Sequence, residues 1–132
     1  MTPTDSPAAA GRQANLDVLE RAFAAASRAD ADEQLQYYCD DAVLEVVFAS
    51  PPLCFEGREQ LSELLTRAYD LNHLVLTIDE VVPCADPDQL VVEFHAQGRV
   101  HETGHEFDKQ YIGRFWFRDG RIARQREFAI TR

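Results

Sequence analysis

One carboxylate near the C-terminus stands among apolar residues. Glu127 lies in the predicted strand 122–130 and is followed by an apolar run. If it faces an apolar pocket, loss of water raises its pKa toward neutrality, and the group can then exchange protons at physiological pH. Strict alternation leaves the core face undecided, because one face carries Ala123, Gln125, Glu127, Ala129 and Thr131, and the other Ile122, Arg124, Arg126, Phe128 and Ile130. Glu127 is therefore either an outward, ion-paired residue or an acid–base residue, and Glu93 and Asp79 remain alternative bases.

A second group of candidate residues lies in the segment 101–106. His101 and His105 are four residues apart, with Glu102 and Glu106 beside them, a spacing that on a helix would direct both imidazoles toward one metal ion. Gly104 and the strand patterns on either side instead favour a polar hairpin loop. We expect no metal site here.

Motifs for covalent or cofactor chemistry are missing from the sequence. It contains no glycine-rich phosphate loop, no Gly-x-Ser-x-Gly and no readable cysteine–histidine signature. Cys39, Cys54 and Cys84 are odd in number and widely spaced, which fits neither a disulfide framework nor a zinc site, so buried thiols are expected. Cofactor-independent acid–base chemistry by carboxylates, histidines or tyrosines remains.

Charge and length limit the partners and the number of domains. The 132 residues include 23 acidic and 13 basic side chains, a net charge of −10 that disfavours nucleic acids and anionic membranes as partners. No run approaches the roughly 20 apolar residues that span a bilayer, and no signal sequence is apparent, so we expect a cytoplasmic protein. We predict a flexible tail over residues 1–12 and a single domain over 13–132.

The apolar pattern predicts three helices before a long meander of strands. Helical spacing begins at Asn15, the expected cap of the first helix; a second helix includes Leu35, Tyr38 and Cys39, and a third follows Gly57. A strand over 42–48 separates the last two helices. From residue 73 the period becomes two, with turns at 86–88 and at 119–120. This order predicts an α+β fold with helices against one face of a curved antiparallel sheet.

The strand 111–118 carries large side chains on both of its faces. If helices cover one face, the other face exposes Ile112 and Trp116, with His95 and Val91 on the neighbouring strand. A second copy of the chain is the expected cover, since two-fold dimers are the commonest homo-oligomers.

Several motifs in order resemble one protein family. These are Tyr38-Cys39-Asp40-Asp41-Ala42-Val43, Phe55-Glu56-Gly57-Arg58-Glu59-Gln60-Leu61, and the run 111–128 with its Tyr-Ile strand, Asp-Gly-Arg-Ile turn and Arg-Glu-Phe ending. Over residues 15–130 the chain resembles SnoaL-like proteins of the nuclear transport factor 2 superfamily, particularly the phenazine-biosynthesis PhzA/PhzB branch. The resemblance implies a cone-shaped α+β barrel of cystatin-like type, with three N-terminal helices on a strongly curved, mostly antiparallel sheet, an apolar pocket, and a homodimer through the outer sheet face.

The resemblance also implies roles for individual residues. Glu127 matches the glutamate of Arg-Glu-Phe that acts as acid and base, and Tyr111 matches a pocket-lining tyrosine. We expect Tyr111, together with His73, to hydrogen-bond the substrate oxygen. For the family's histidine, His73 is the nearby candidate, while Thr77 stands at the register counted back from the turn at 86–87. The remaining aromatic residues are interpreted as pocket walls that bind the ligand, or as core around them: Tyr38, Phe48, Phe94, Phe115 and Trp116.

Three functional hypotheses follow. The first is a small acid–base enzyme of secondary metabolism without cofactor or metal, acting on a carbonyl-bearing or cyclic intermediate by isomerisation, cyclisation, condensation or dehydration. The second is a non-catalytic small-molecule-binding or carrier protein of the same fold. The third is an interaction module that uses the outer face of the sheet.

Overall fold

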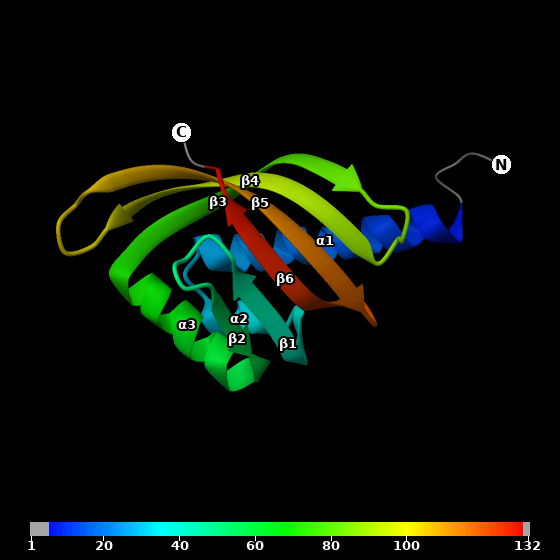
Figure 1. Cartoon of the computed structure of the whole chain (residues 1–132), viewed down its shortest axis with the longest axis horizontal. Coiled ribbons are helices and arrows are strands. Elements are labelled where there is room, and N and C mark those ends of the chain that lie inside the picture. The colour runs from blue at the N-terminus through cyan, green and yellow to red at the C-terminus, as the bar shows by residue number, and fades with distance from the viewer. Residues whose placement is uncertain (1–5, 131–132) are drawn as a thin grey trace.

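The structure, a computed structural model, describes residues 6–130 and contains three helices and one six-stranded sheet in that range (Figure 1). The elements in chain order are α1 (Pro7–Ser27), α2 (Ala31–Leu35), β1 (Tyr38–Val46), β2 (Leu53–Glu56), α3 (Gly57–Leu71), β3 (Asn72–Pro83), β4 (Gln89–Val100), β5 (Glu106–Arg118) and β6 (Arg121–Ala129).

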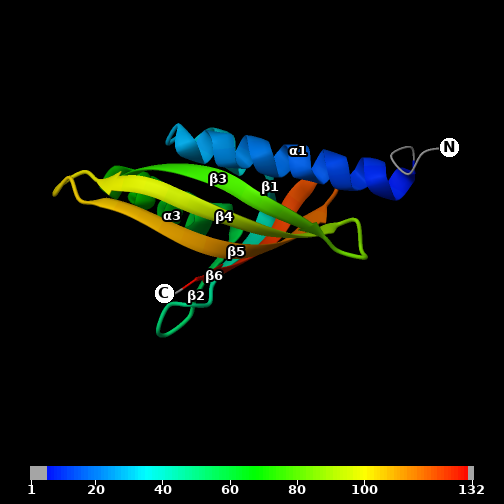
Figure 2. The ribbon, with the colours of Figure 1, turned by 90° about the horizontal axis from the view of Figure 1, so that it is seen from above.

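The sheet has the order β2-β1-β6-β5-β4-β3. Its strands β3 to β6 form the predicted antiparallel meander, whereas β1 pairs with β6 in parallel. Helix α1 lies along one face of the curved sheet (Figure 2) and packs on β3, β4 and β6, while α3 packs on β1, β2 and β3. The predicted α+β class with helices against a mostly antiparallel sheet is thus confirmed, with a mixed sheet that stays open between β2 and β3.

Helix α1 begins earlier than predicted. Ser6 caps it by accepting a hydrogen bond from the Ala9 amide at 3.0 Å, and Pro7 occupies the first turn, where a missing N–H costs nothing. The predicted tail over 1–12 is therefore wrong for the helical residues from Pro7 onward, while residues 1–5 lie outside the described residues. Asn15, the expected cap, is buried within the helix and donates to the Pro87 carbonyl at 3.0 Å.

Tyr38 and Cys39 are strand residues, so the prediction that they belong to the second helix is wrong. Asp30 caps α2 by accepting from the Glu33 amide at 3.0 Å, but the helix ends at Leu35. Tyr38 then pairs with Ile122 of β6. A parallel pairing between such distant segments leaves no local signal in the sequence.

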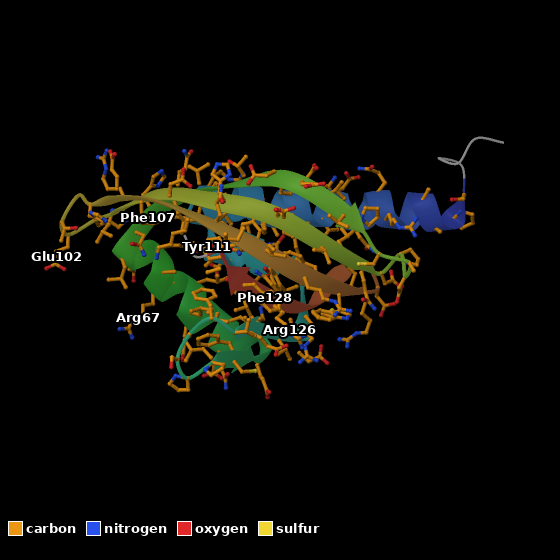
Figure 3. The ribbon with its side chains drawn as sticks, turned by 45° about the horizontal axis from the view of Figure 1, so that its top comes forward. Arg67, Glu102, Phe107, Tyr111, Arg126 and Phe128 are labelled. Carbon is orange, nitrogen blue, oxygen red and sulfur yellow. The ribbon has the colours of Figure 1, made fainter. Side chains whose placement is uncertain are left out.

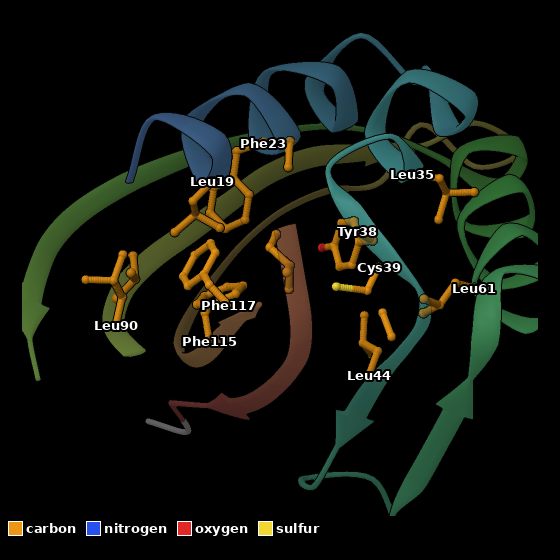
Figure 4. Close-up of a cluster of buried hydrophobic side chains, with 14 of the residues drawn as sticks. Leu19, Phe23, Leu35, Tyr38, Cys39, Leu44, Leu61, Leu90, Phe115 and Phe117 are labelled. Carbon is orange, nitrogen blue, oxygen red and sulfur yellow. The ribbon is translucent and has the colours of Figure 1, made fainter. Parts of the chain in front are cut away.

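The core lies between α1 and the inner face of the sheet (Figure 4). Phe23 of α1 contacts Phe94 and Phe115 with ring centroids 5.0 Å and 6.1 Å apart. The predicted inward face of β4 is confirmed, since Leu90, Val92, Phe94 and Ala96 are all buried. Cys39 is also buried, but Cys54 is exposed, which contradicts the expectation of three buried thiols.

The outer face of the sheet carries a partly exposed aromatic residue held by cations. The guanidinium groups of Arg114, Arg124 and Arg126 lie 4.4, 5.6 and 5.3 Å from the centroid of the Trp116 ring. Arg124 also donates to Glu45 of β1 at 2.5 Å. Arg126 and Phe128 lie together on β6 (Figure 3), and the Phe128 residue is 41% exposed.

Candidate active site

A cavity of about 250 Å³ lies between the inner face of the sheet and α3. Its walls are mostly apolar, and Glu127 is the one acidic residue among them. The residues that line it are Phe23, Gln34, Tyr38, Leu44, Val46, Phe48, Leu64, Leu65, Ala68, Tyr69, Leu74, Leu76, Phe94, Tyr111, Gln125 and Glu127. An apolar hollow with a few converging polar groups is the usual form of a small-molecule site.

Glu127 faces the cavity because β6 contains an irregularity. Phe117 of β5 pairs with Ile122 of β6, and Trp116, the residue before Phe117, pairs with Arg124. Ala123 is therefore an extra residue of β6 with no partner in β5 at this point. Such a bulge reverses the alternation of the strand. Ile122 is consequently buried in the core, and Glu127, five residues later, points to the same side and not to the outer face.

The environment of the Glu127 carboxyl alters its acidity. Burial raises its pKa from 4.5 to about 7, although a hydrogen bond from Gln125 acts in the opposite direction. That bond joins Nε2 of Gln125 to Oε1 of Glu127 at 2.7 Å. A carboxyl with such a pKa is present in both protonation states near neutral pH, which general acid–base catalysis requires.

Two tyrosine–glutamine pairs supply most of the other polar atoms of the cavity. The Tyr38 hydroxyl donates to Oε1 of Gln125 at 2.5 Å, and the Tyr69 hydroxyl donates to Oε1 of Gln34. Burial is the main cause that raises the pKa of both phenols, with a further contribution from the Glu127 carboxylate. Both tyrosines are therefore neutral hydrogen-bond donors at physiological pH.

Tyr111 lies on β5 at the side of the cavity nearest its mouth. Its ring stacks on Phe94 with centroids 5.2 Å apart and an interplanar angle of 18°, and Phe48 lies 6.0 Å away on the other side. Burial raises the pKa of Tyr111, and the Glu127 carboxylate raises it further. Among residues 6–130 the Tyr111 hydroxyl has no hydrogen-bond partner, so it can donate to a ligand.

The structure brings together five of the eight predicted site residues. Glu127, Tyr111, Tyr38, Phe48 and Phe94 all line the cavity. Phe115 does not line it and is fully buried in the core, where its ring contacts Phe23. The prediction for Trp116 is wrong, because this side chain lies on the outer face of the sheet and belongs neither to the cavity nor to the core. Whether any of these residues acts on a ligand stays a prediction.

His73 lies elsewhere. It borders a shallow hollow of about 810 Å³ at the far end of the sheet, with Arg99 and Glu106, whose side chains are paired at 3.0 Å and well exposed. The alternative at that register, Thr77, is also exposed, and Asp79 on the same strand pairs with His95 at 2.9 Å outside the cavity. The structure thus contradicts the placement of His73 beside Glu127, because β3 directs Leu74 and Leu76 inward and His73 outward.

Three polar cavity residues had no signal in the sequence. Gln34, Tyr69 and Gln125 lie on α2, α3 and β6, and each looks like an ordinary surface residue in its local pattern. The inward position of Gln125 follows from the bulge in β6, which reverses the alternation of the strand and so turns both Gln125 and Glu127 toward the cavity.

The histidine-containing segment forms the loop between β4 and β5, with Glu102 near its tip (Figure 3). His101 and His105 are exposed, and Nε2 of His101 lies 3.3 Å from the Tyr69 carbonyl oxygen. Within the described part of the chain, no three His, Cys, Asp or Glu residues gather in a way that could hold a metal ion.

Comparison with known proteins places this geometry in context. Residues 19–125 match the model of the SnoaL-like domain. YesE, an uncharacterised protein of Bacillus subtilis, is 32% identical over 92 residues, which cover 67% of this chain and 63% of YesE. The PhzA/B-like protein PA3332 of Pseudomonas aeruginosa is 33% identical over 99 residues, which cover 69% of each chain. The match therefore spans less than two thirds of YesE.

Three solved structures share this fold. A candidate isomerase of Bacillus subtilis superposes with a TM-score of 0.83 at 26% identity, covering 91% of this chain and 88% of that one. The phenazine biosynthesis-related protein PhzB2 of Pseudomonas aeruginosa superposes with a TM-score of 0.77 at 19% identity, covering 93% and 83%. RV0760c of Mycobacterium tuberculosis, solved in complex with estradiol-17beta-hemisuccinate, gives 0.78 at 17% identity, covering 87% and 92%.

Proposed function

This chain belongs to the SnoaL-like domain family, and we propose that it is a cofactor-independent acid–base enzyme in which Glu127 moves a proton on a small carbonyl-bearing or cyclic intermediate. The observation that carries the proposal is the Glu127 carboxyl inside an apolar cavity, where burial raises its pKa to about 7. The relatives named as a candidate isomerase and a PhzA/B-like protein support a reaction of this class.

The arrangement suits the isomerisation of an unsaturated ketone. The Glu127 carboxylate removes a proton from the carbon beside the carbonyl, the electron pair moves onto the carbonyl oxygen, and the neutral Tyr111 hydroxyl stabilises the resulting oxyanion by a hydrogen bond. Protonated Glu127 then returns the proton to the far end of the dienolate. The apolar walls exclude water and so prevent loss of the proton to solvent.

The volume of the cavity limits the ligand. About 250 Å³ holds the volume of about eight water molecules and lies below the range of about 300–1,000 Å³ that is usual for sites of drug-sized ligands. We therefore propose a ligand with one or two rings. The exposed Phe48 side chain at the mouth allows a longer substituent to extend toward solvent.

Cyclohex-3-en-1-one is a suitable probe because it fits this volume and its conversion to the conjugated isomer is followed by ultraviolet absorbance. We expect Glu127→Gln to lower the rate by about 10²-fold or more while leaving the fold intact. Glu63→Gln, an exposed change on α3, is the matched control and should leave the rate unaltered. Equal rates for the Glu127 variant and the unaltered protein would refute the assignment of the base.

A carrier protein is the second candidate, favoured by the mutual hydrogen bonding of the cavity's own polar groups, which keeps the unliganded cavity stable. Fluorescence titration with 2-naphthol distinguishes the two. Tight binding of this phenol combined with no turnover of cyclohexenone would select the carrier.

We also propose a homodimer through the outer face of the sheet. Phe128 is exposed there, Ile112 and Trp116 are partly exposed, and register places Ile112 opposite Phe128. No helix within residues 6–130 is long and apolar enough to cross a membrane. The cytoplasmic location, the role in secondary metabolism and the absence of nucleic-acid partners stay predictions.

A further inference from the structure

The polar groups of the cavity form an ordered chain of hydrogen bonds that ends at Glu127. Tyr38 of β1 donates to Oε1 of Gln125 at 2.5 Å, and Nε2 of the same amide donates to Oε1 of Glu127 at 2.7 Å. Tyr38 and Gln125 are 4% exposed, so water does not compete for either bond. The chain connects two strands that pair in parallel across the sheet.

The two bonds fix the direction of the Gln125 amide. A side-chain amide can rotate by 180° and present either its oxygen or its NH₂ group to a neighbour. The Tyr38 hydroxyl donates to Oε1 of Gln125 at 2.5 Å, and this bond holds the amide oxygen on the Tyr38 side. The NH₂ group is consequently turned toward Glu127, where it favours the ionised carboxylate.

The same bonds make the two oxygens of Glu127 different. Oε1 is occupied by Gln125, whereas Oε2 forms no hydrogen bond with any residue in the described range 6–130. A proton that arrives at or leaves the carboxyl therefore does so at Oε2, which is the oxygen left for a ligand.

We propose that Tyr38 is a positioning residue that acts through the Gln125 amide: by holding that amide in one orientation, it sets the proton affinity of Glu127 and selects Oε2 as the oxygen that exchanges protons with the substrate. This inference rests on the proposed function for its catalytic meaning. The hydrogen-bond chain and its effect on Glu127 do not depend on turnover.

The other titratable groups around Glu127 act differently. Tyr69 of α3 bonds to Gln34 and not to Gln125, and Tyr111 of β5 has no bond to either amide. On β6 itself Arg126 points to the outer face and bonds to Glu45. Among residues 6–130, no Lys, Arg or His lines the cavity, so the Gln125 amide is the group there that opposes the effect of burial on the carboxyl.

Carboxyl carbon NMR of protein labelled with ¹³C at the glutamate side chains tests the proposal without any substrate. The Glu127 signal is identified by its loss in Glu127→Gln. We expect Gln125→Met, which keeps the volume but removes the donor, to raise the titration midpoint of Glu127 by about one pH unit. Tyr38→Phe should also raise it, because the released amide can rotate and accept a hydrogen bond from protonated Glu127.

A double variant separates action through the amide from direct action. In the Gln125→Met variant, adding Tyr38→Phe should leave the titration midpoint of Glu127 unchanged, because Tyr38 acts on Glu127 only through the Gln125 amide. Tyr111→Phe is the matched control, because it removes one hydroxyl from the same cavity without altering the hydrogen bonds of Tyr38, Gln125 and Glu127. In this variant the titration midpoint of Glu127 should equal that of the unaltered protein.

Three results would overturn the proposal: an unchanged midpoint in Gln125→Met, additive shifts in the double variant, or equal shifts in Tyr38→Phe and Tyr111→Phe. If Tyr38→Phe does not fold, the Gln125→Met midpoint still decides. The pH–rate profile for cyclohexenone adds a second readout, in which the acidic limb should move with the midpoint. If the proposed enzyme function is wrong, cyclohexenone is not turned over but the variants still change the titration midpoint of Glu127. If the role of Tyr38 is wrong, cyclohexenone is turned over but the variants do not change the midpoint as expected.

Discussion

Removing the buried carboxyl should change how the stability of the protein depends on pH. In the folded state burial raises the pKa of Glu127 from 4.5 to about 7, so between these values the folded chain holds a proton that the unfolded chain releases. The free energy of unfolding therefore falls as pH rises through this window and levels off above it. At about 1.36 kcal/mol for each pH unit, ionised Glu127 destabilises the fold by about 3 kcal/mol above neutral pH.

Glu127→Gln has no ionised form and escapes this penalty. Its free energy of unfolding, measured by urea denaturation, should exceed that of the unaltered protein by about 3 kcal/mol more at pH 8 than at pH 4.5. Other titrating groups cancel in the difference between the two proteins. Glu63→Gln on the exposed surface of α3 serves as the control and should give a difference that is nearly constant with pH. If the difference in free energy of unfolding between Glu127→Gln and the unaltered protein were also constant with pH, the Glu127 carboxyl would not be buried as described.

Three further changes test other parts of the molecule. Trp116→Glu puts a carboxylate in the centre of the outer sheet face and should convert the proposed dimer to a monomer in sedimentation analysis, with the fold kept because this side chain is partly exposed. Phe48→Ala should weaken binding of 2-naphthol by about tenfold, because Phe48 lines the cavity, and should barely change the melting temperature, because the residue is 49% exposed. Gly113→Ala should destabilise the fold by about 1–3 kcal/mol in urea denaturation, because the new methyl group would lie 2.7 Å from Phe115 and 3.0 Å from Phe94; an unchanged stability would contradict the tight packing there.

Elements with strong local signals could be predicted from the sequence. The apolar residues of α3 recur at helical spacing, and the structure forms that helix over Gly57–Leu71. The Asp-Gly turn before β6 is also confirmed: Asp119 and Gly120 have φ angles of 52° and 76°, as a tight hairpin turn between right-twisted strands requires. Residues 7–12 give no helical pattern because they contain no large apolar side chain, although Ser6 and Pro7 carry the start signal.

The site could be predicted only in part, because its geometry depends on pairings between distant strands. Tyr38 lies in the cavity as a result of the parallel contact of β1 with β6, which no local pattern reports. The side of the sheet to which Glu127 points depends even more directly on strand register. If Ile122 is assigned to the core and the strand alternates without interruption, Glu127 faces solvent; the extra residue opposite Phe117 and Trp116 is what reverses this result. The pattern left both interpretations open because a bulge is set by the register between β5 and β6.

The cavity divides its polar groups between those that bond to one another and those that remain for a ligand. Tyr38, Gln125, Tyr69 and Gln34 use hydrogen bonds on each other or on one oxygen of Glu127. The Tyr111 hydroxyl and the second oxygen of Glu127 are among the cavity's polar groups that form no hydrogen bond with residues 6–130. In the proposed function, the ligand would therefore offer one acceptor to Tyr111 and one exchangeable proton to Glu127, with apolar contact elsewhere. An enolisable ketone has both features on the two sides of its carbonyl carbon, whereas a hydrocarbon has neither and a carboxylate would bring a second negative charge beside Glu127.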